Sequence, residues 1–122
     1  MSRIRGKNTL LELSGFELLK KTNLRFRRHP RGIYGKPDAA LKNRKIAVFF
    51  DSEFWHGFKF KEFKKRLPND YWVRKIENNR RRDKLVTKEL KKNGWTVIRF
   101  WESELFKKPE DCLKEINSFK NH

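Results

Sequence analysis

The chain has 122 residues, and its 32 Lys and Arg against 15 Asp and Glu give a formal net charge of +17. So large a charge indicates a polyanionic partner, nucleic acid first, and a 14% aromatic content excludes a merely disordered basic tail. The length fits one compact domain over residues 1–122, and the longest apolar run, residues 46–50, is far short of the roughly 20 residues that span a bilayer. Because no apolar signal core follows the basic N-terminus, we expect a cytoplasmic protein, associated with the nucleoid in a prokaryote.

Cysteine usage excludes two further ways of stabilising a small fold. The single cysteine, Cys112, has no partner for an internal disulfide and no Cys/His cluster around it for a zinc finger. We therefore expect the fold to depend on its apolar core.

The N-terminal segment predicts an arm followed by a helix. Residues 1–8 are basic and polar, and Thr9 with Glu12 three positions later has capping-box spacing at the start of a helix over 10–21. At about 100° per residue, Glu12 falls inside the sector that leucines and Phe16 fill. A carboxylate in that sector is a candidate functional group.

Three strands are predicted next. Alternation of apolar and basic residues indicates an edge strand over 24–28, and the proline and glycines of residues 29–35 indicate a loop. A short strand over 37–41 and a mostly apolar strand over 45–51, joined by a turn, predict a hairpin.

The C-terminal half predicts two helices and one strand. After an irregular aromatic and basic stretch, a long helix capped by Asn69 or Asp70 runs to about Lys92. A strand over 95–101 and an amphipathic helix over 109–119 follow. The order α-β-β-β-α-β-α predicts an α/β fold with a mixed central sheet flanked by helices.

Five residues that a purely structural account explains poorly are candidates for catalysis: Glu12, Asp38, Asp51, His56 and Asp83. Asp38 opens the first hairpin strand and Asp51 closes the second, so the two carboxylates should be neighbours. Asp83 and Asn79 lie in the apolar stripe of the long helix. Phosphodiester hydrolysis needs a divalent cation, and hard Mg²⁺ takes carboxylate and carbonyl oxygens. It also needs a base, for which histidine is suited.

Each residue alone has an ordinary structural explanation. A strand-end aspartate is commonly a turn cap, Glu12 completes the capping box, and Asp83 can pair with a neighbouring arginine. Their convergence in one strongly basic chain favours a nuclease.

Motifs in the same order along nearly the whole chain carry a resemblance: Met1–Thr9 with Glu12, Gly35–Asp38, Val48–Asp51, Phe54–Gly57, Tyr71–Trp72, Lys75–Ile76 with Asn79, Arg82–Asp83, Asn93–Trp95 and Trp101–Glu102. Together they resemble the very-short-patch-repair (Vsr) mismatch endonucleases. The resemblance implies a restriction-endonuclease-like core of the PD-(D/E)XK type. It also implies an enzyme that nicks one strand beside a T:G mismatch, using one or two Mg²⁺ ions. Asp38 and the backbone carbonyl of Phe50 are the implied metal ligands, with Asp51 a further candidate.

The other catalytic roles and the DNA contacts follow from the same resemblance. His56 is the implied base, Asp83 orients it, and Glu12 holds water on the metal. The positions matching DNA contacts are Phe54, Trp55 and Trp72 as wedges between base pairs, Lys75 and Asn79 beside the mismatched bases, and Met1 and Ile4 toward the minor groove.

The aromatic wedges and a run of three arginines on the long helix both have alternative, purely structural explanations. Phenylalanine and tryptophan are commonly core residues rather than wedges. The basic run of Arg80, Arg81 and Arg82 suits the phosphates of double-stranded DNA, yet part of it can equally be a solvated helix face.

The chain departs from the family at metal-binding positions. Asp51 stands where well-known members have a histidine, and the positions of the family's zinc ligands hold Glu53, Phe58, Phe60 and Ser103. Phenylalanine cannot ligate a metal and no cysteine is nearby, so we expect no zinc. Phe58 and Phe60 are expected to form an apolar plug instead.

Two other functions fit the sequence. A restriction-type or mobile-element nuclease without mismatch preference would use the same catalytic residues. A non-catalytic basic nucleic-acid-binding protein would have no reason to align Glu12 and Asp83 with apolar stripes. For the Vsr-like endonuclease we expect a monomer that acts on double-stranded DNA.

Overall fold

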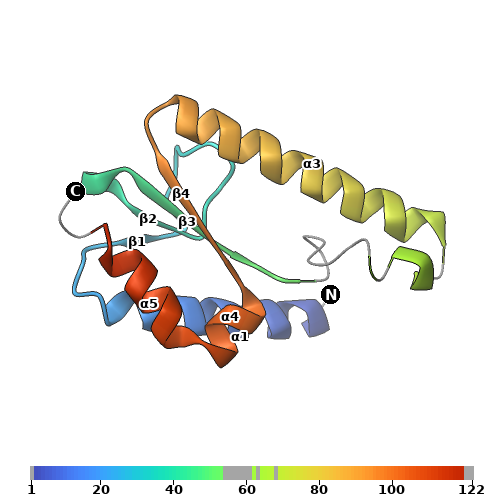
Figure 1. Ribbon diagram of the computed structural model, residues 1–122, viewed down its shortest axis with the longest axis horizontal. Helices are drawn as coiled ribbons and strands as arrows, with labels where there is room; N and C mark the ends of the chain where they lie inside the picture. Colours follow the sequence, from blue (N-terminus) through green and yellow to red (C-terminus); the bar gives the residue numbers. More distant parts are fainter. Residues whose placement is uncertain (1, 54–61, 63, 68, 120–122) are drawn as a thin grey trace.

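The computed structural model describes residues 2–53, 62, 64–67 and 69–119 (Figure 1). The described elements are α1 (Ser2–Lys20), β1 (Arg27–Arg28), β2 (Ala39–Leu41), η1 (Lys42–Arg44), β3 (Ile46–Asp51), η2 (Lys64–Arg66), α3 (Asp70–Lys92), β4 (Thr96–Trp101), α4 (Glu102–Lys107) and α5 (Pro109–Asn117). None of the helices in the described part of the chain is long and apolar enough to cross a membrane.

The four strands form one mixed sheet in the order β1-β2-β3-β4. β1 and β2, and β2 and β3, pair antiparallel, with Ala39 opposite Val48, whereas β3 and β4 pair parallel, with Asp51 beside Trp101. All six residues of β3 are buried, which explains their near-continuous apolar run. The α/β architecture with a mixed central sheet, and the predicted hairpin, are confirmed, and the arrangement is consistent with a restriction-endonuclease-like fold.

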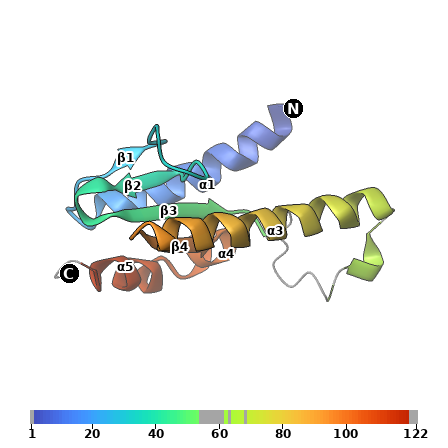
Figure 2. The ribbon, with the colours of Figure 1, turned by 90° about the horizontal axis from the view of Figure 1, so that it is seen from above.

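Helices cover both faces of the sheet (Figures 1 and 2). Side chains alternate along β3, so Val48 and Phe50 join the larger core with α1, α4 and α5, while Ala47 and Phe49 pack with α3. This alternation places α1 and α3 on opposite sides of the same strand.

A glycine brings α1 close to β3. A Cβ added at Gly15 would collide with the ring of Phe50, so no larger residue fits there without moving the helix or the ring. Phe50 also contacts Phe16 edge to face, with ring centroids 5.5 Å apart. This close approach fixes the distance between α1 and the end of β3.

Three features of the fold differ from the sequence-based expectations. The helix begins at Ser2, so residues 2–8 continue α1 and do not form a separate arm, and Thr9 is not its N-cap. β1 is limited to two residues, Arg27 and Arg28, while Leu24 and Phe26 of the predicted strand pack on the core ahead of it. The short helix α4 was not predicted, although Glu104 gives a local signal: its Oε1 accepts a hydrogen bond from the Trp101 N–H (2.9 Å) and caps the helix.

Candidate active site

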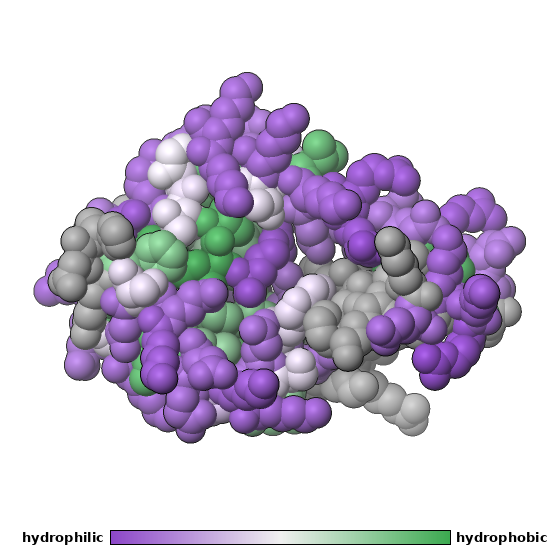
Figure 3. Space-filling view, viewed as in Figure 1, coloured by the Kyte–Doolittle hydropathy of each residue, from purple (hydrophilic) through white to green (hydrophobic). Residues whose placement is uncertain are grey.

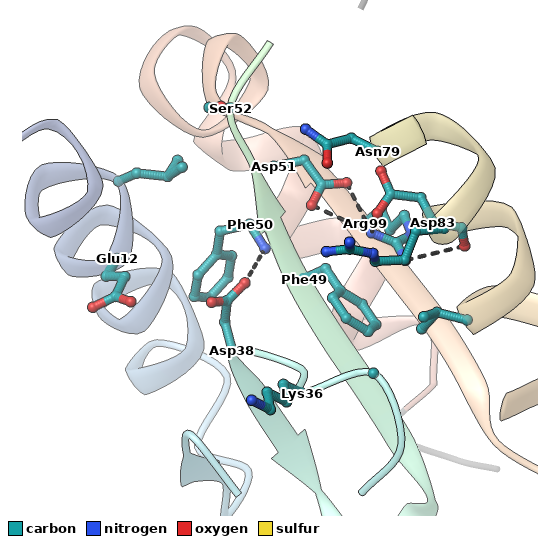
Figure 4. Close-up of a pocket in the computed structure, with 14 residues that line it drawn as sticks. Glu12, Lys36, Asp38, Phe49, Phe50, Asp51, Ser52, Asn79, Asp83 and Arg99 are labelled. Carbon is teal, nitrogen blue, oxygen red and sulfur yellow. Dashed lines mark hydrogen bonds and ion pairs between the residues drawn. The ribbon is translucent and has the colours of Figure 1, made fainter. Parts of the chain in front are cut away.

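A pocket of about 410 Å³ lies at the end of β3, between α1 and α3 (Figure 4). Glu12 lines it from α1, and Asn79 and Asp83 line it from α3. Asp38 and Asp51 both line it from the sheet, so the prediction that the two strand-end carboxylates lie near each other is confirmed. In Figure 4 the end of β3 runs between Asp38 on the α1 side and Asp51 on the α3 side.

Asp38 is held where β2 begins. Its backbone N–H donates to the Val48 carbonyl (3.0 Å), and its Oδ2 accepts a hydrogen bond from the Phe50 N–H (2.7 Å). Burial raises the pKa of Asp38 to about 6, and the negative charges of Glu12 and Asp51 add to this effect, while the Phe50 N–H and, to a smaller extent, the nearby His29 oppose it. Ionised Asp38 is therefore a desolvated anion in a field of like charge.

Glu12 and His29 stand beside Asp38. The His29 N–H donates to the Asp38 carbonyl (2.8 Å), and its Nε2 lies 3.4 Å from Glu12 Oε1. One ligand atom from each of the three side chains lies within 4.8 Å of the other two. This donor set of two carboxylates and one imidazole fits a divalent cation, whose charge would relieve the repulsion at Asp38.

The loop before Asp38 depends on Gly35. Its φ of +81° lies in the left-handed region, and an added Cβ would collide with the Val86 side chain on α3. The chain therefore passes close to α3 just before it reaches Asp38, and buried Pro37 then leads into the strand.

The α3 side of the pocket has a different charge arrangement. Arg99, on β4, donates from Nη1 to both carboxylate oxygens of Asp51, at 3.3 and 3.1 Å. The same nitrogen lies 3.8 Å from Asp83 Oδ1, and Arg99 Nε donates to the Thr87 hydroxyl (3.2 Å). The guanidinium also lies over the Phe49 ring, 4.0 Å from its centroid. Asp51, only 4% exposed, is thus buried next to the guanidinium of Arg99, which compensates its charge.

The long helix α3 presents a basic groove next to this pocket. The residues lining the groove are Tyr71, Arg74, Lys75, Asn78, Asn79 and Arg82. Lys75 Nζ lies over the Tyr71 ring at 5.8 Å, and Trp72 is partly buried against Tyr71. Arg81 and Arg82 are exposed and Arg80 is partly buried, and hydrophilic side chains dominate the face seen in Figure 3.

His56, Phe54, Trp55 and Met1 lie outside the described residues. Ile4 belongs to α1, and only its backbone is described.

Comparison with known proteins bears directly on this site. Residues 1–62 match the family described as DNA mismatch endonuclease Vsr. A type II nicking enzyme, V.HpaIIP, from Haemophilus parainfluenzae is 40% identical over 92% of this chain and 81% of its own length. The chain belongs to the Vsr family. It is therefore a DNA endonuclease, and the alternative of a non-catalytic nucleic-acid-binding protein is excluded.

Two further relatives match this chain with 38% and 29% identity. The type II nicking enzyme V.NmeDIP from Neisseria meningitidis is 38% identical over 95% of this chain and 80% of its own length. The DNA mismatch endonuclease Vsr of Escherichia coli is 29% identical over 86% of this chain and 68% of its own length.

Two positions that the resemblance links to zinc in other Vsr proteins are joined here by hydrogen bonds. Glu53 Oε1 accepts from the Ser103 N–H (2.9 Å), and the Glu53 N–H donates to Glu102 Oε1 (3.1 Å). The pair of contacts links the end of β3 to the first turn of α4. Phe58 and Phe60, the expected apolar plug, lie outside the described residues.

Sequence reasoning missed two residues of this Vsr-family site. The sequence predicts a loop at His29, and the local signal there is that His29 directly follows the predicted edge strand. Arg99 lies in a predicted strand, and a single charge in its mostly apolar run, TVIRFW, indicates a residue with a buried partner. Tyr71, exposed at 59% on the α3 groove, belongs to a motif of the resemblance but has no role assigned from the sequence.

Proposed function

We propose that this endonuclease hydrolyses a phosphodiester bond of double-stranded DNA with Mg²⁺ held at Asp38, nicking one strand beside a T:G mismatch. The observation that carries the proposal is the grouping of partly buried Asp38 with Glu12 and His29 at the pocket, and the pKa of Asp38, raised to about 6, supports it. A carboxylate in such surroundings favours either a proton or a metal ion.

The residues around Asp38 have complementary roles in the proposal. Asp38 binds the cation together with the backbone carbonyl of Phe50. This carbonyl points to the same side of β3 as the Phe50 N–H, which donates a hydrogen bond to Asp38. Glu12 positions water, His56 is the base and Asp83 orients it. The cation, when bound, neutralises charge that develops on the phosphate and makes water easier to deprotonate.

The proposal places one cation on the Asp38 side and none at Asp51. Asp51 is already neutralised by two hydrogen bonds from Arg99, so a second dication beside it would face the guanidinium charge. We therefore assign Asp51 and Arg99 to holding the floor of the pocket.

DNA would lie along the α3 groove. The net charge of +17 and the exposed Arg74, Lys75 and Arg82 favour phosphate contacts, and Asn79 lies between this groove and the catalytic pocket because it lines both. Trp72, with Phe54 and Trp55, is the proposed wedge, and opening a base step by such a wedge costs a few kcal/mol that a bent duplex recovers in contacts. We propose that the protein binds as a monomer.

One alternative shares this chemistry but not the specificity. Several relatives are named type II nicking enzymes, and a restriction-associated nuclease without mismatch preference would use the same pocket. Cleavage of matched and mismatched DNA separates the two functions.

The experiment uses two duplexes that differ only at one base pair, T:G or T:A, with each strand labelled separately. Purified protein is incubated with either duplex in Mg²⁺ or in EDTA, and the products are separated on denaturing gels. We expect one strand of the T:G duplex to be nicked in Mg²⁺ alone. Equal nicking of both duplexes would establish the alternative, and cleavage in EDTA would contradict the metal assignment.

A further inference from the structure

His29 is fixed against the catalytic pocket by its backbone and its ring. Its φ of 45° places it in the left-handed region, which a histidine adopts more readily than most residues. Its N–H bonds to the Asp38 carbonyl, and its ring contacts Phe16 edge to face at 5.8 Å. Arg28 pairs with Ala39 in the sheet, so the position of His29 follows from the β1–β2 register.

The distances among the three side chains are close to those of a coordinated ion. Metal–oxygen bonds of about 2.1 Å hold neighbouring ligand atoms about 3 Å apart and opposite ones about 4.2 Å apart. His29 Nε2 and Glu12 Oε1 are 3.4 Å apart, and all three ligand atoms of the group lie within 4.8 Å of one another. Small side-chain movements would therefore bring all three onto one ion.

We infer that His29 and Glu12 join Asp38 as direct ligands of the cation, forming a Glu-His-Asp site that binds Mn²⁺ more tightly than Mg²⁺. The inference rests on the proposed function for the location of the cation. It goes further in two ways. Glu12 binds the cation directly instead of acting only through water, and His29 adds a nitrogen ligand that the proposed function does not require.

The chemistry of the ligands supplies the metal preference. Oxygen ligands suit Mg²⁺, Ca²⁺ and Mn²⁺ alike, whereas an imidazole nitrogen suits transition metals, so a site that combines two carboxylates with one imidazole favours Mn²⁺ over Mg²⁺. A neutral imidazole also completes the coordination without adding negative charge to a group in which Glu12 and Asp51 already raise the pKa of Asp38. Mg²⁺ would still bind through the two carboxylates, with lower affinity.

The test measures Mn²⁺ binding to the DNA-free protein. Electron paramagnetic resonance of unbound Mn²⁺ gives the affinity, and pulsed measurements on the bound ion detect hyperfine coupling to a ligand nitrogen. His29→Asn is the main variant because asparagine tolerates the left-handed backbone, and His29→Gly repeats the test without any side chain. Glu12→Gln tests the second ligand, and Glu17→Gln, an exposed carboxylate on the same helix, is its matched control.

We expect nitrogen coupling in the unmodified protein and in His56→Ala, and its loss in both His29 variants. Mn²⁺ affinity should fall by about tenfold or more in His29→Asn and in Glu12→Gln, and stay unchanged in Glu17→Gln. Coupling that persists in both His29 variants, or that disappears in His56→Ala, would overturn the inference.

Cleavage assays separate this inference from the proposed function. If the nitrogen coupling depends on His29 but the Asp38→Asn variant still cuts DNA, the cation site is supported and its catalytic role is contradicted. If cleavage needs Asp38 but Mn²⁺ affinity and nitrogen coupling do not depend on His29, the proposed function is supported and the Glu-His-Asp site is contradicted.

Discussion

The two carboxylates at the end of the β2–β3 hairpin, Asp38 and Asp51, line one pocket but differ in how their charge is compensated. Asp51 faces α3 and accepts two hydrogen bonds from the Arg99 guanidinium. Asp38 lies toward α1, accepts one backbone N–H, and has a pKa raised to about 6 by burial and by neighbouring negative charge. A buried ion pair needs no further ligand, whereas a partly buried anion beside another carboxylate is destabilised until a proton or a metal ion binds.

This difference explains how one strand can support both stability and chemistry. Successive side chains of β3 point to opposite faces of the sheet, so Phe49 and Asp51 contact the α3 side while Phe50 packs toward α1. The α3 side holds the pocket together through Arg99. The α1 side is where we place the cation.

The largest expected effect comes from removing the charge at Asp38. Asp38→Asn should lower the single-turnover cleavage rate by at least about 10³-fold, because it removes a ligand of the cation. DNA affinity measured in EDTA should be unchanged, since Asp38 faces the pocket and not the α3 groove. Asp111→Asn, an exposed aspartate on α5, is the control. Near-normal cleavage by Asp38→Asn would place the catalytic cation elsewhere.

The next largest effect should follow from breaking the pair on the other side. Arg99→Met leaves Asp51 buried without its guanidinium, and we expect a loss of about 3 kcal/mol in the free energy of unfolding, measured by urea denaturation at neutral pH. Adding Asp51→Asn should restore part of the loss, because the unpaired charge is gone. The exposed Arg74→Met should change stability by less than about 0.5 kcal/mol. A loss below about 1 kcal/mol in Arg99→Met would mean that Asp51 does not depend on this partner.

A smaller change should disturb the α1 side alone. In Gly15→Ala the new methyl group collides with the Phe50 ring, so we expect about 2 kcal/mol of destabilisation together with slower cleavage. The neighbouring Ser14→Ala adds no atoms toward Phe50 and serves as the control. Full stability and activity in Gly15→Ala would show that the spacing between α1 and β3 is not fixed by this contact.

The smallest predicted effect is a gain in stability. The folded-state pKa of Asp38 lies above the unfolded value of 3.8, so folding favours the protonated form, and this advantage is lost as the pH rises through about 6. The difference between 3.8 and about 6 corresponds to about 3 kcal/mol. The polar amide of asparagine keeps part of this desolvation cost, so without divalent metal Asp38→Asn should raise the stability by about 1–2 kcal/mol at pH 8 and have little effect below pH 4. Thermal melts in EDTA across this pH range measure it. A stabilisation that grows toward acid pH would have the wrong sign.

Local patterns in the sequence predicted much of this site. The apolar run of β3 and the hairpin placed Asp38 and Asp51 at one edge, because strand direction alone fixes which ends meet. Helical spacing placed Glu12 and Asp83 on the inner faces of α1 and α3, and both line the pocket.

The residues that the sequence did not reveal depend on tertiary register. His29 reaches Glu12 only because β1 pairs with β2 and the backbone then turns through a left-handed residue, and no spacing rule encodes that turn. For Asp83, the sequence offers pairing with a neighbouring arginine as one explanation. An arginine does lie near it, but Arg99 comes from β4, sixteen positions away, because α3 packs across that strand.

The number and position of bound cations test the central claim most directly. Equilibrium titration of the DNA-free protein with Mn²⁺ should give one tight site per chain. Asp38→Asn should abolish that site, whereas Asp51→Asn, which leaves Arg99 with an uncharged hydrogen-bond acceptor, should retain it. Two tight sites in the unmodified protein, or a site that is lost in Asp51→Asn and kept in Asp38→Asn, would contradict the assignment of the cation to the α1 side of β3.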